Sequence, residues 1–386
     1  MTASAASVLF LALAFHSLVT YPISLQLLSR RQPPLSLEPR DSARPSLAIC
    51  VSAYNEQEVI AEKITCLLAM AQAYGPATVH VFADCPTDGT VGILRGFADR
   101  IDLVESDQRR GKTYGMNMLA ARSDSDLIMF TDANVRSSDD AALELVRPFG
   151  DPSVGMVTAK LVYSNPGETP TSTLGATYWS IEERIKRIET RTVGLIGCDG
   201  AMFVIRRSAY EVPPAHLIDD LYLSLTVLIK GLRVVSVDHV LVFERSATGS
   251  IEEKRRKQRI SCQAIKVHRF LWPQLRLMPA LPLYAYISHR VLKWMMPFSL
   301  LGLAISATLL LGLAISPLAA AAVIPAAAAL LYVGDRLGIH QASLAISAII
   351  SLHGVGLGVL EGAFTRKTYA VWEPAISVRS EEVEAR

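Results

Sequence analysis

A carboxylate and a carboxamide stand two residues apart in the stretch MFTDANV, as Asp132 and Asn134. Their oxygens are hard ligands of the kind that Mg²⁺ and Mn²⁺ accept. Asp and Asn also form ordinary turns, so the pair alone is weak evidence for a metal site. It follows an apolar run, Leu127 to Phe130, which is typical of a buried strand. We therefore expect both side chains at the end of a strand.

Three further apolar runs are typical of buried strands, and helical patterns such as Glu56 to Ala73 separate them: Leu47 to Ser52, Val79 to Ala83 and Ile101 to Val104. Short apolar runs between helices predict a mainly parallel sheet covered on both faces. Ligands of such α/β sheets lie beyond the carboxyl ends of the strands. The polar residues just past these ends are Tyr54, Asn55, Glu56, Asp84 and Asp132.

Several classes of protein lack support in the sequence. Neither a GxGxxG turn nor a GxxxxGK[ST] loop is present, which argues against a dinucleotide site and a P-loop. The net charge of +2 over 386 residues does not suggest binding to nucleic acid. The five cysteines are scattered and form no CxxC pair, so neither a disulfide framework nor a zinc site is expected.

Long stretches without charge predict membrane helices. No Asp, Glu, Lys or Arg occurs in residues 1–29, 294–334 or 337–360. A helix needs roughly 20 apolar residues to cross a bilayer, so the first stretch predicts an anchor and the second predicts two spans with a turn near Ser316. A cleaved signal peptide is the alternative for the first stretch, but MTASAASV lacks basic residues. We expect an integral membrane protein.

Basic residues flank the soluble middle of the chain, namely Arg30, Arg31, Arg40 and Arg44 before it and His289, Arg290 and Lys293 after it. The positive-inside rule then places this region in the cytoplasm, on a multi-pass protein of the inner membrane. Three C-terminal spans would put the tail outside, although it carries Arg366 and Lys367. Either the third segment is re-entrant or interfacial, or the tail is external, and the sequence leaves both open.

Six motifs in order resemble glycosyltransferase family 2: SAYNE (52–56), ADCPTDGT (83–90), GKTYGMN (111–117), FTDAN (130–134), GCDGAMFVIRR (197–207) and IDDLYLSL (218–225). The resemblance is to the membrane-attached members, such as cellulose, hyaluronan and poly-N-acetylglucosamine synthases. It spans about residues 47 to 300 and extends to the ending TYAVWEP. It implies an α/β GT-A domain that binds a nucleotide-sugar, with transmembrane helices at both ends.

The expected organisation has six parts, which are an anchor (1–29), a Pro-rich linker (30–46), a cytoplasmic GT-A domain (47–278), an interfacial helix (279–293), two or three transmembrane or re-entrant helices (294–362) and a polar tail (363–386). The interfacial helix is suggested by the mixture of apolar and basic residues in LPLYAYISHRVLK. Such a helix would set the site against the membrane.

The resemblance assigns the nucleotide contacts to matching positions. Tyr54, Asn55 and Glu56 lie in the first nucleotide-binding loop, and Asp84 lies in the second, where relatives bind uracil and ribose. Lys112 belongs to a Gly-Lys pair that faces the nucleotide. In the second loop Cys85 and Pro86 replace the usual Gly-Ser, so we expect a different loop shape, because Gly permits backbone angles that Cys resists.

The resemblance also assigns the metal ligands and the base. Asp132 and Asn134 occupy the DxD positions that hold Mg²⁺ or Mn²⁺ against the diphosphate, and Asn134 replaces the commoner second Asp. Asp220 matches the carboxylate that takes a proton from the acceptor hydroxyl. Asp219 and Asp220 also stand where a helix begins, so helix capping is the competing interpretation. Asp219 could cap while Asp220 reacts.

One motif departs from the family pattern. Relatives carry Gln-x-x-Arg-Trp, and in this chain Arg256, Arg259 and Ile260 stand at the first, fourth and fifth positions. Both arginines suit a diphosphate, which guanidinium groups bind bidentately. The Trp supplies a platform for the acceptor sugar in polymerising relatives, and Ile260 cannot stack in the same way.

The expected function is an inverting glycosyltransferase that moves a sugar from a nucleotide-sugar, with UDP as the expected nucleotide, to a glycan or lipid acceptor at the membrane. Processive polysaccharide synthesis and single-sugar transfer to a lipid both remain open, as do partner subunits and a homo-oligomer. A nucleotidyltransferase, a non-catalytic nucleotide-binding scaffold and a transporter are the alternative classes. The last has little support, because the apolar stretches carry few ionisable residues.

Overall fold

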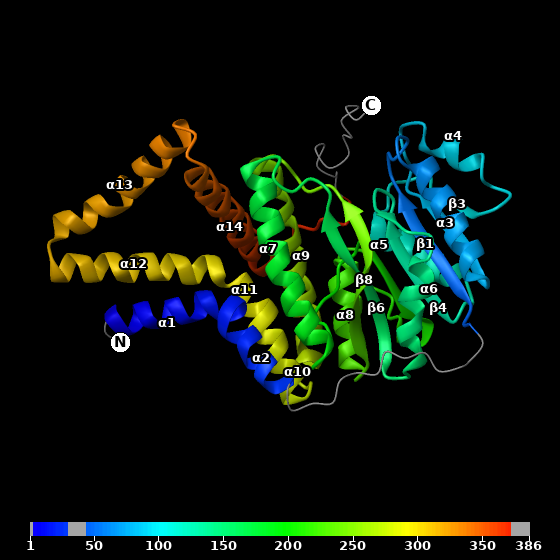
Figure 1. Ribbon diagram of the computed structural model, residues 1–386, viewed down its shortest axis with the longest axis horizontal. Helices are drawn as coiled ribbons and strands as arrows, with labels where there is room; N and C mark the ends of the chain where they lie inside the picture. Colours follow the sequence, from blue (N-terminus) through cyan, green and yellow to red (C-terminus); the bar gives the residue numbers. More distant parts are fainter. Residues whose placement is uncertain (1–2, 30–43, 372–386) are drawn as a thin grey trace.

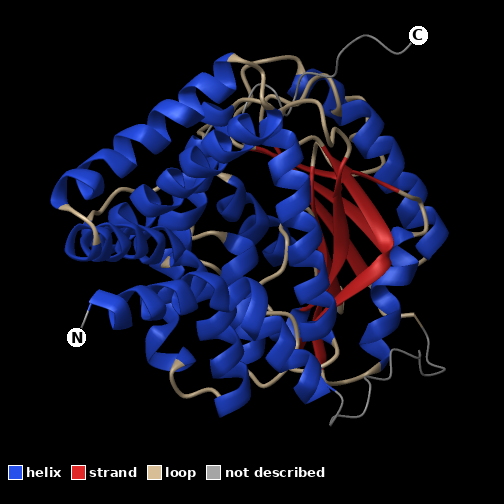
Figure 2. Ribbon diagram, turned by 60° about the vertical axis from the view of Figure 1, so that its left-hand side comes forward, coloured by secondary structure: helices blue, strands red, loops and turns tan. Residues whose placement is uncertain are grey.

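The computed structural model describes residues 3–29 and 44–371. A mixed eight-stranded sheet lies at the centre of the soluble domain, in the order β3-β2-β1-β4-β7-β6-β8-β5 (Figure 2). The strands are β1 (Leu47–Ala53), β2 (Ala77–Ala83), β3 (Asp102–Glu105), β4 (Leu127–Asp132), β5 (Arg136–Ser137), β6 (Val154–Tyr163), β7 (Met202–Arg206) and β8 (Arg233–Glu244).

The four predicted strands are confirmed as β1 to β4, and they are parallel. Their register decides where their ends lie, since Ser52 stands opposite Asp132 and Ala53 stands opposite Ala83. The ends of β1, β2 and β4 therefore meet at one edge. The other half of the sheet is less regular, because β7 runs antiparallel to both β4 and β6.

Alternate residues of β4 enter two different hydrophobic cores, as expected for a strand covered on both faces. Leu127 and Met129 pack with helices α3 and α6, whereas Ile128 and Phe130 pack with α5 and α8. The helices of the domain are α3 (Ile60–Tyr74), α4 (Thr90–Arg95), α5 (Lys112–Arg122), α6 (Ala141–Val146), α7 (Pro170–Thr190), α8 (Asp219–Ile229) and α9 (Ser250–Leu275). The α/β class is confirmed.

Four helical segments in the described part of the chain are long and apolar enough to cross a membrane: Ala3–Leu28, Met296–Ala314 (α12), Pro317–Arg336 (α13) and His340–Phe364 (α14). The first comprises α1 (Ala3–Phe15), a π-helical turn and most of α2 (Tyr21–Ser29). Figure 1 shows α1 and α12 side by side, extending away from the sheet. The predicted turn at Ser316 is confirmed, and its side chain caps α13 by accepting a hydrogen bond from the Ala319 amide at 3.1 Å.

Helix α14 returns to the soluble domain and packs along α9 (Figure 1). Glycines make this approach close, because a Cβ at Gly358 would lie 2.2 Å from the carbonyl oxygen of Gln258. The segment after α14 continues across the same helix, where Gln263 donates a hydrogen bond to the Tyr369 carbonyl at 3.3 Å. The described end of the tail therefore lies against the soluble domain.

A buried ionic cluster fastens the N-terminal helix to this domain through α7. The His289 ring lies between two carboxylates, 2.5 Å from Glu182 and 2.6 Å from Glu189, and Tyr21 donates to Glu189 at 2.5 Å. Arg290 donates to the carbonyls of residues 196 and 197 at 2.6 and 2.8 Å. His289 and Arg290 belong to η4 (Ile287–Val291), which lies between α10 (Ala280–Tyr286) and α11 (Leu292–Trp294). An interfacial position for this segment stays a prediction.

Candidate active site

Asp132 is the last residue of β4, and a buried lysine holds the turn that follows it. Lys63 of α3 donates to the Thr131 hydroxyl at 2.9 Å and to the Val135 carbonyl at 2.7 Å. Burial lowers the pKa of Lys63 to about 8. The sequence analysis missed Lys63, because one lysine in an amphipathic helix carries no signal of burial. It fixes both ends of the turn that carries Asp132 and Asn134.

Lys112 links Asp132 to the start of α8. Its ammonium group lies 2.6 Å from Asp132 Oδ1 and 3.6 Å from Asp219 Oδ2, and it donates to the Gly200 carbonyl at 3.3 Å. Burial opposes the charge on Lys112, but the attraction of Asp132 and Asp219 outweighs it and raises the pKa. The structure thus brings together Lys112 and Asp132, two of the residues predicted to form the site.

Asp220 lies in the first turn of α8, half-buried beside this group. Burial, and then repulsion from Asp219, raises the pKa of Asp220 to about 7, although Lys112 opposes the shift. A Cβ added to Gly200 would lie 3.1 Å from Asp220 Oδ2 and 3.4 Å from Lys112 Nζ, so a glycine there keeps the space between them open. Asp220 is poised to exchange a proton near neutral pH.

The capping interpretation of Asp219 is wrong. Helix α8 begins at Asp219 itself, and its N-cap residue, Ile218, makes no side-chain cap. Asp219 is buried, and its Oδ2 atom has no hydrogen-bond partner among the described residues. A buried carboxylate oxygen without a hydrogen bond is costly unless positive charge is near, and the Lys112 ammonium lies 3.6 Å from it.

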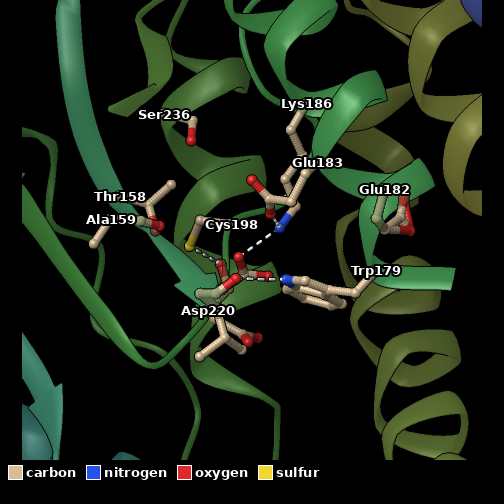
Figure 3. A network of polar contacts seen from close by, with 12 residues as sticks. Thr158, Ala159, Trp179, Glu182, Glu183, Lys186, Cys198, Asp220 and Ser236 are labelled. Carbon is tan, nitrogen blue, oxygen red and sulfur yellow. Dashed lines mark hydrogen bonds and ion pairs between the residues drawn. The ribbon is translucent and has the colours of Figure 1, made fainter. Parts of the chain in front are cut away.

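The loop before β7 contacts both Asp220 and α7. Cys198 donates a weak hydrogen bond to the Asp220 carbonyl at 3.5 Å, and Asp199 lies 2.5 Å from Lys186 of α7. Figure 3 shows Lys186 and Glu183 beside Cys198 and Asp220 in this network. Because Arg290 donates hydrogen bonds to the carbonyls of residues 196 and 197, this loop connects Asp220 to the segment that precedes α12.

The donor set suits a hard divalent cation. Asp132 supplies a carboxylate, Asn134 supplies a carboxamide, and the Asp219 carboxylate lies nearby, 3.6 Å from Lys112. Across the described residues no three His, Cys, Asp or Glu side chains converge as a metal cage. Mg²⁺ bound to a nucleotide diphosphate needs only one or two protein oxygens, because phosphate and water complete its coordination. Asp132 and Asn134 would hold such an ion, which when bound offsets the charge on the diphosphate.

The two predicted nucleotide loops contact each other at the edge of the sheet. Asn55 Oδ1 accepts a hydrogen bond from the Thr87 amide at 2.8 Å, and the Glu56 amide donates to Thr90 at 2.8 Å. Asn55 and Cys85 both have positive φ, 52° and 53°. Cys85 thus keeps the left-handed backbone that a glycine adopts more easily.

Asp84 and Tyr54 hold the stretch that leads into α5. Asp84 is buried and accepts hydrogen bonds from the amides of Arg110 at 2.6 Å and Gly111 at 2.8 Å. The Arg109 guanidinium lies 3.5 Å from the centre of the Tyr54 ring. Contacts of Asp84 and Tyr54 with a nucleotide stay predictions, since the structure shows them organising the loop before Lys112.

The two predicted arginines lie on α9 in different surroundings. Arg256 is paired with Glu253 at 2.8 Å. Burial, and then repulsion from Arg256, lowers the pKa of Arg259 to about 10, against the attraction of Asp220. Arg259 is therefore attracted electrostatically by Asp220, whereas the charge of Arg256 is paired with Glu253 on its own helix.

Aromatic residues of α7 lie beside α9, where the Lys257 ammonium is 4.9 Å from the centre of the Tyr178 ring, but their polar atoms are bonded elsewhere. Tyr178 donates to Glu182 at 2.7 Å, and Trp179 donates to the Leu161 carbonyl at 2.8 Å. The Lys186 ammonium lies 4.1 Å from the centre of the Trp179 ring. The structure does not place either ring in the role of the missing tryptophan at Ile260.

The sequence analysis also missed Glu244, the last residue of β8. Its Oε1 atom lies 3.2 Å from the Asn134 amide nitrogen. Burial, and then the charge on Asp132, raises the pKa of Glu244. No local pattern around VFER marks this glutamate, because its partner lies in a different part of the chain.

Gly111, which precedes Lys112, is covered by the tail. It has a φ of +91°, and a Cβ there would lie 2.1 Å from the Ala370 carbonyl oxygen. We expect Gly111→Ala to destabilise the protein by about 1–3 kcal/mol, because a side chain is strained at this φ and meets backbone. Donor affinity should fall with it, since Lys112 follows directly. Thermal unfolding and nucleotide titration would measure both effects.

Gly92→Ala is the matched control, because an added Cβ at Gly92 meets nothing within 4 Å and its φ is not positive. Equal stability of the two variants would contradict the close approach of the tail to Gly111.

The fold, with Asp132 at the end of β4 and Asp219 and Asp220 at the start of α8, is that of the GT-A nucleotide-diphospho-sugar transferases. The solved structure of the mannosyltransferase PcManGT from Pyrobaculum calidifontis, in complex with GDP-Man and Mn²⁺, superposes with a TM-score of 0.69 at 19% identity, covering 95% of this chain and 100% of that one. The likeness thus includes the membrane helices. Residues 48–212 match the model of glycosyl transferase family 2. The matched residues lie within the soluble domain, so this part of the chain is similar to that family.

Curated relatives agree with this assignment. An N-acetylglucosaminyltransferase of Azorhizobium caulinodans is 29% identical over 210 residues, covering 49% of this chain and 52% of the relative. A poly-β-1,6-N-acetyl-D-glucosamine synthase of Staphylococcus aureus is 22% identical over 196 residues, covering 49% of this chain and 47% of the relative. The chain spans about half the length of the curated relatives it matches.

Proposed function

We propose that this chain is an inverting, metal-dependent glycosyltransferase that moves a sugar from a UDP-sugar to a glycan or lipid acceptor at the membrane. One observation carries the proposal, namely that Asp220, with its pKa of about 7, lies beside the Lys112–Asp132 pair at the carboxyl ends of the strands. Asp220 takes the proton from the acceptor hydroxyl, which attacks the anomeric carbon as the nucleotide diphosphate leaves. Attack opposite the leaving group turns an α-linked donor into a β-linkage.

The proposed topology places the catalytic domain in the cytoplasm, with the N-terminal segment, α12 and α13 crossing the inner membrane. The tail contacts α9 of the catalytic domain, so an even number of crossings must separate them. Two crossings by α12 and α13 satisfy this condition, and α14 then lies along the domain. Arg366 and Lys367 stay on the cytoplasmic side, as the positive-inside rule requires.

The relatives suggest N-acetylglucosamine as the first donor sugar to test, and the GDP-Man complex of the mannosyltransferase makes GDP-mannose the competing donor. Two kinds of acceptor are possible, a growing polymer or a lipid that receives a single sugar. Polymer synthesis is suggested by one relative, the poly-β-1,6-N-acetyl-D-glucosamine synthase. Single-sugar transfer is favoured by Ile260, which offers no aromatic surface to a growing chain.

Purified full-length protein in detergent, given radiolabelled UDP-N-acetylglucosamine, other UDP-sugars or GDP-mannose with Mg²⁺ or Mn²⁺, would test the proposal. Donor-dependent labelling of an acceptor supports it, and the product's size separates a polymer from a single addition. NMR of the new anomeric centre distinguishes inversion from retention. Binding of donors without transfer to any membrane-extract acceptor would instead support a scaffold.

The pH dependence of transfer follows from Asp220. The base acts as a carboxylate, and its pKa is raised to about 7, so the active form is lost as the pH falls through neutrality. We expect kcat/KM to fall about tenfold per unit below that value and to level off above it. Donor binding measured across the same range separates this effect from lost affinity. A flat profile between about pH 5.5 and 8 would contradict the assignment of Asp220.

A further inference from the structure

The residue at the second ligand position, Asn134, has a carboxylate partner supplied by a distant strand. Glu244 Oε1 lies 3.2 Å from Asn134 Nδ2. The pairing of β5 with β8 creates this contact, because Arg136 stands opposite Phe243 and Ser137 opposite Val242 in an antiparallel ladder. The strand that leaves Asn134 is therefore bonded to the strand that ends at Glu244.

The backbone of Glu244 is itself fixed. It pairs with Tyr163 of β6, and its carbonyl accepts a hydrogen bond from the Ser164 amide at 2.9 Å. The side chain thus extends toward Asn134 from a strand held on two sides, by β5 and by β6. A group held in this way can restrain the side chain that it contacts.

The chemistry of the contact determines which atom of the amide faces Glu244. The nitrogen is the only donor in the Asn134 side chain, and it donates to Glu244 Oε1 at 3.2 Å. The nitrogen therefore faces Glu244, and the carbonyl oxygen of the same amide is turned away from it. Among the described residues none donates a hydrogen bond to this oxygen. This carbonyl oxygen is the atom through which residue 134 could bind a cation beside Asp132.

We propose that Glu244 is a positioning residue of the metal site, which fixes the Asn134 amide so that its oxygen is available as a ligand. This inference rests on the proposed function. An aspartate at position 134 would present oxygen in either rotation, whereas an amide can present nitrogen, which does not bind Mg²⁺ or Mn²⁺ in this way. By accepting the hydrogen bond from the Asn134 nitrogen, Glu244 disfavours the orientation that would present nitrogen to the metal.

The test measures Mn²⁺ binding directly, by the electron paramagnetic resonance signal of free Mn²⁺ with the full-length protein and UDP, so that no turnover is needed. Glu244→Gln should weaken Mn²⁺ binding by about tenfold or more, as loss of an outer partner of a metal ligand typically does. Glutamine can donate as well as accept, so it no longer dictates how Asn134 faces. Glu62→Gln is the control, because Glu62 contacts Arg136 of the same segment at 3.4 Å without touching Asn134.

Asn134→Asp provides a sharper test, because the effect of Glu244→Gln should then change sign. In that background Glu244 faces a like charge, whereas a glutamine at position 244 can donate a hydrogen bond to the introduced carboxylate. The double variant should bind Mn²⁺ more tightly than Asn134→Asp alone and at least as tightly as the native protein. A merely structural role for Glu244 predicts the same loss in both backgrounds.

Glu244→Asp, which keeps a carboxylate, should lose less affinity than Glu244→Gln, and it serves if the latter does not fold. An Mn²⁺ affinity of Glu244→Gln within about twofold of the Glu62→Gln control, or an equal loss in both backgrounds, would overturn the proposal. If these effects on Mn²⁺ binding are observed but no sugar transfer is found, the proposed function is contradicted and the role of Glu244 still holds.

Discussion

Asp220→Asn is expected to reduce the turnover of sugar transfer by about a hundredfold to ten-thousandfold, the usual contribution of a general base. Asparagine has nearly the same shape but cannot accept the proton of the acceptor hydroxyl. The hydrogen bond from the Leu221 amide to Oδ1, now 2.5 Å long, can still form with the amide oxygen. Helix α8 should therefore keep its start, and donor binding should remain.

The measurement is turnover at saturating donor, together with UDP binding by calorimetry. Asp238→Asn is the matched control, because Asp238 is a partly exposed residue paired with Arg187 at 2.7 Å, away from the site. Turnover above about one tenth of the native value in Asp220→Asn would exclude it as the base. An unchanged biological function in that variant would favour the scaffold alternative.

Asp132→Asn, or removal of divalent cations by a chelator, is expected to lower transfer by about a hundredfold or more, because a metal ion at a leaving group provides several kcal/mol of stabilisation. The substitution also removes the carboxylate that lies 2.6 Å from Lys112. Lys112 keeps Asp219 and the Gly200 carbonyl as partners, so the fold should survive. Donor binding should weaken together with turnover, in contrast to Asp220→Asn.

Turnover and Mn²⁺ binding of Asp132→Asn would be compared with Asp140→Asn, which alters an exposed carboxylate in the segment that follows. Addition of Mn²⁺ after chelation should restore the native enzyme and leave Asp132→Asn inactive. A full rate in the presence of chelator would show that Lys112 and the arginines are sufficient to neutralise the diphosphate.

Much of the architecture could be predicted from local patterns. The apolar runs at residues 47–52 and 127–130 became β1 and β4, because a strand buried on both faces must be apolar throughout. The turn at Ser316 and the long uncharged helices followed from the same kind of rule. Strands β5 to β8 were not predicted. Strands β5 and β7 are short and antiparallel to their neighbours, and such pairings depend on distant partners rather than on their own composition.

The strand pattern predicted that Asp132 lies at the ligand-binding edge of the sheet. The resemblance to glycosyltransferase family 2 added Asn134, Lys112 and Asp220 to the predicted site. Which of them touch was decided only by the tertiary structure. Lys112 lies between Asp132 and Asp219, and Glu244 reaches Asn134 from a strand more than a hundred residues away in sequence.

Local patterns were enough to predict the α/β domain, the long apolar helices and the residue types at the strand ends, because apolar periodicity is a property of each segment alone. The tertiary structure decided the partner of each charged group, the raised pKa of Asp220 and the contact of the tail with the domain. Such pairings depend on strand register and helix packing. These bring together side chains from distant segments, and the sequence pattern of one segment does not indicate its partner.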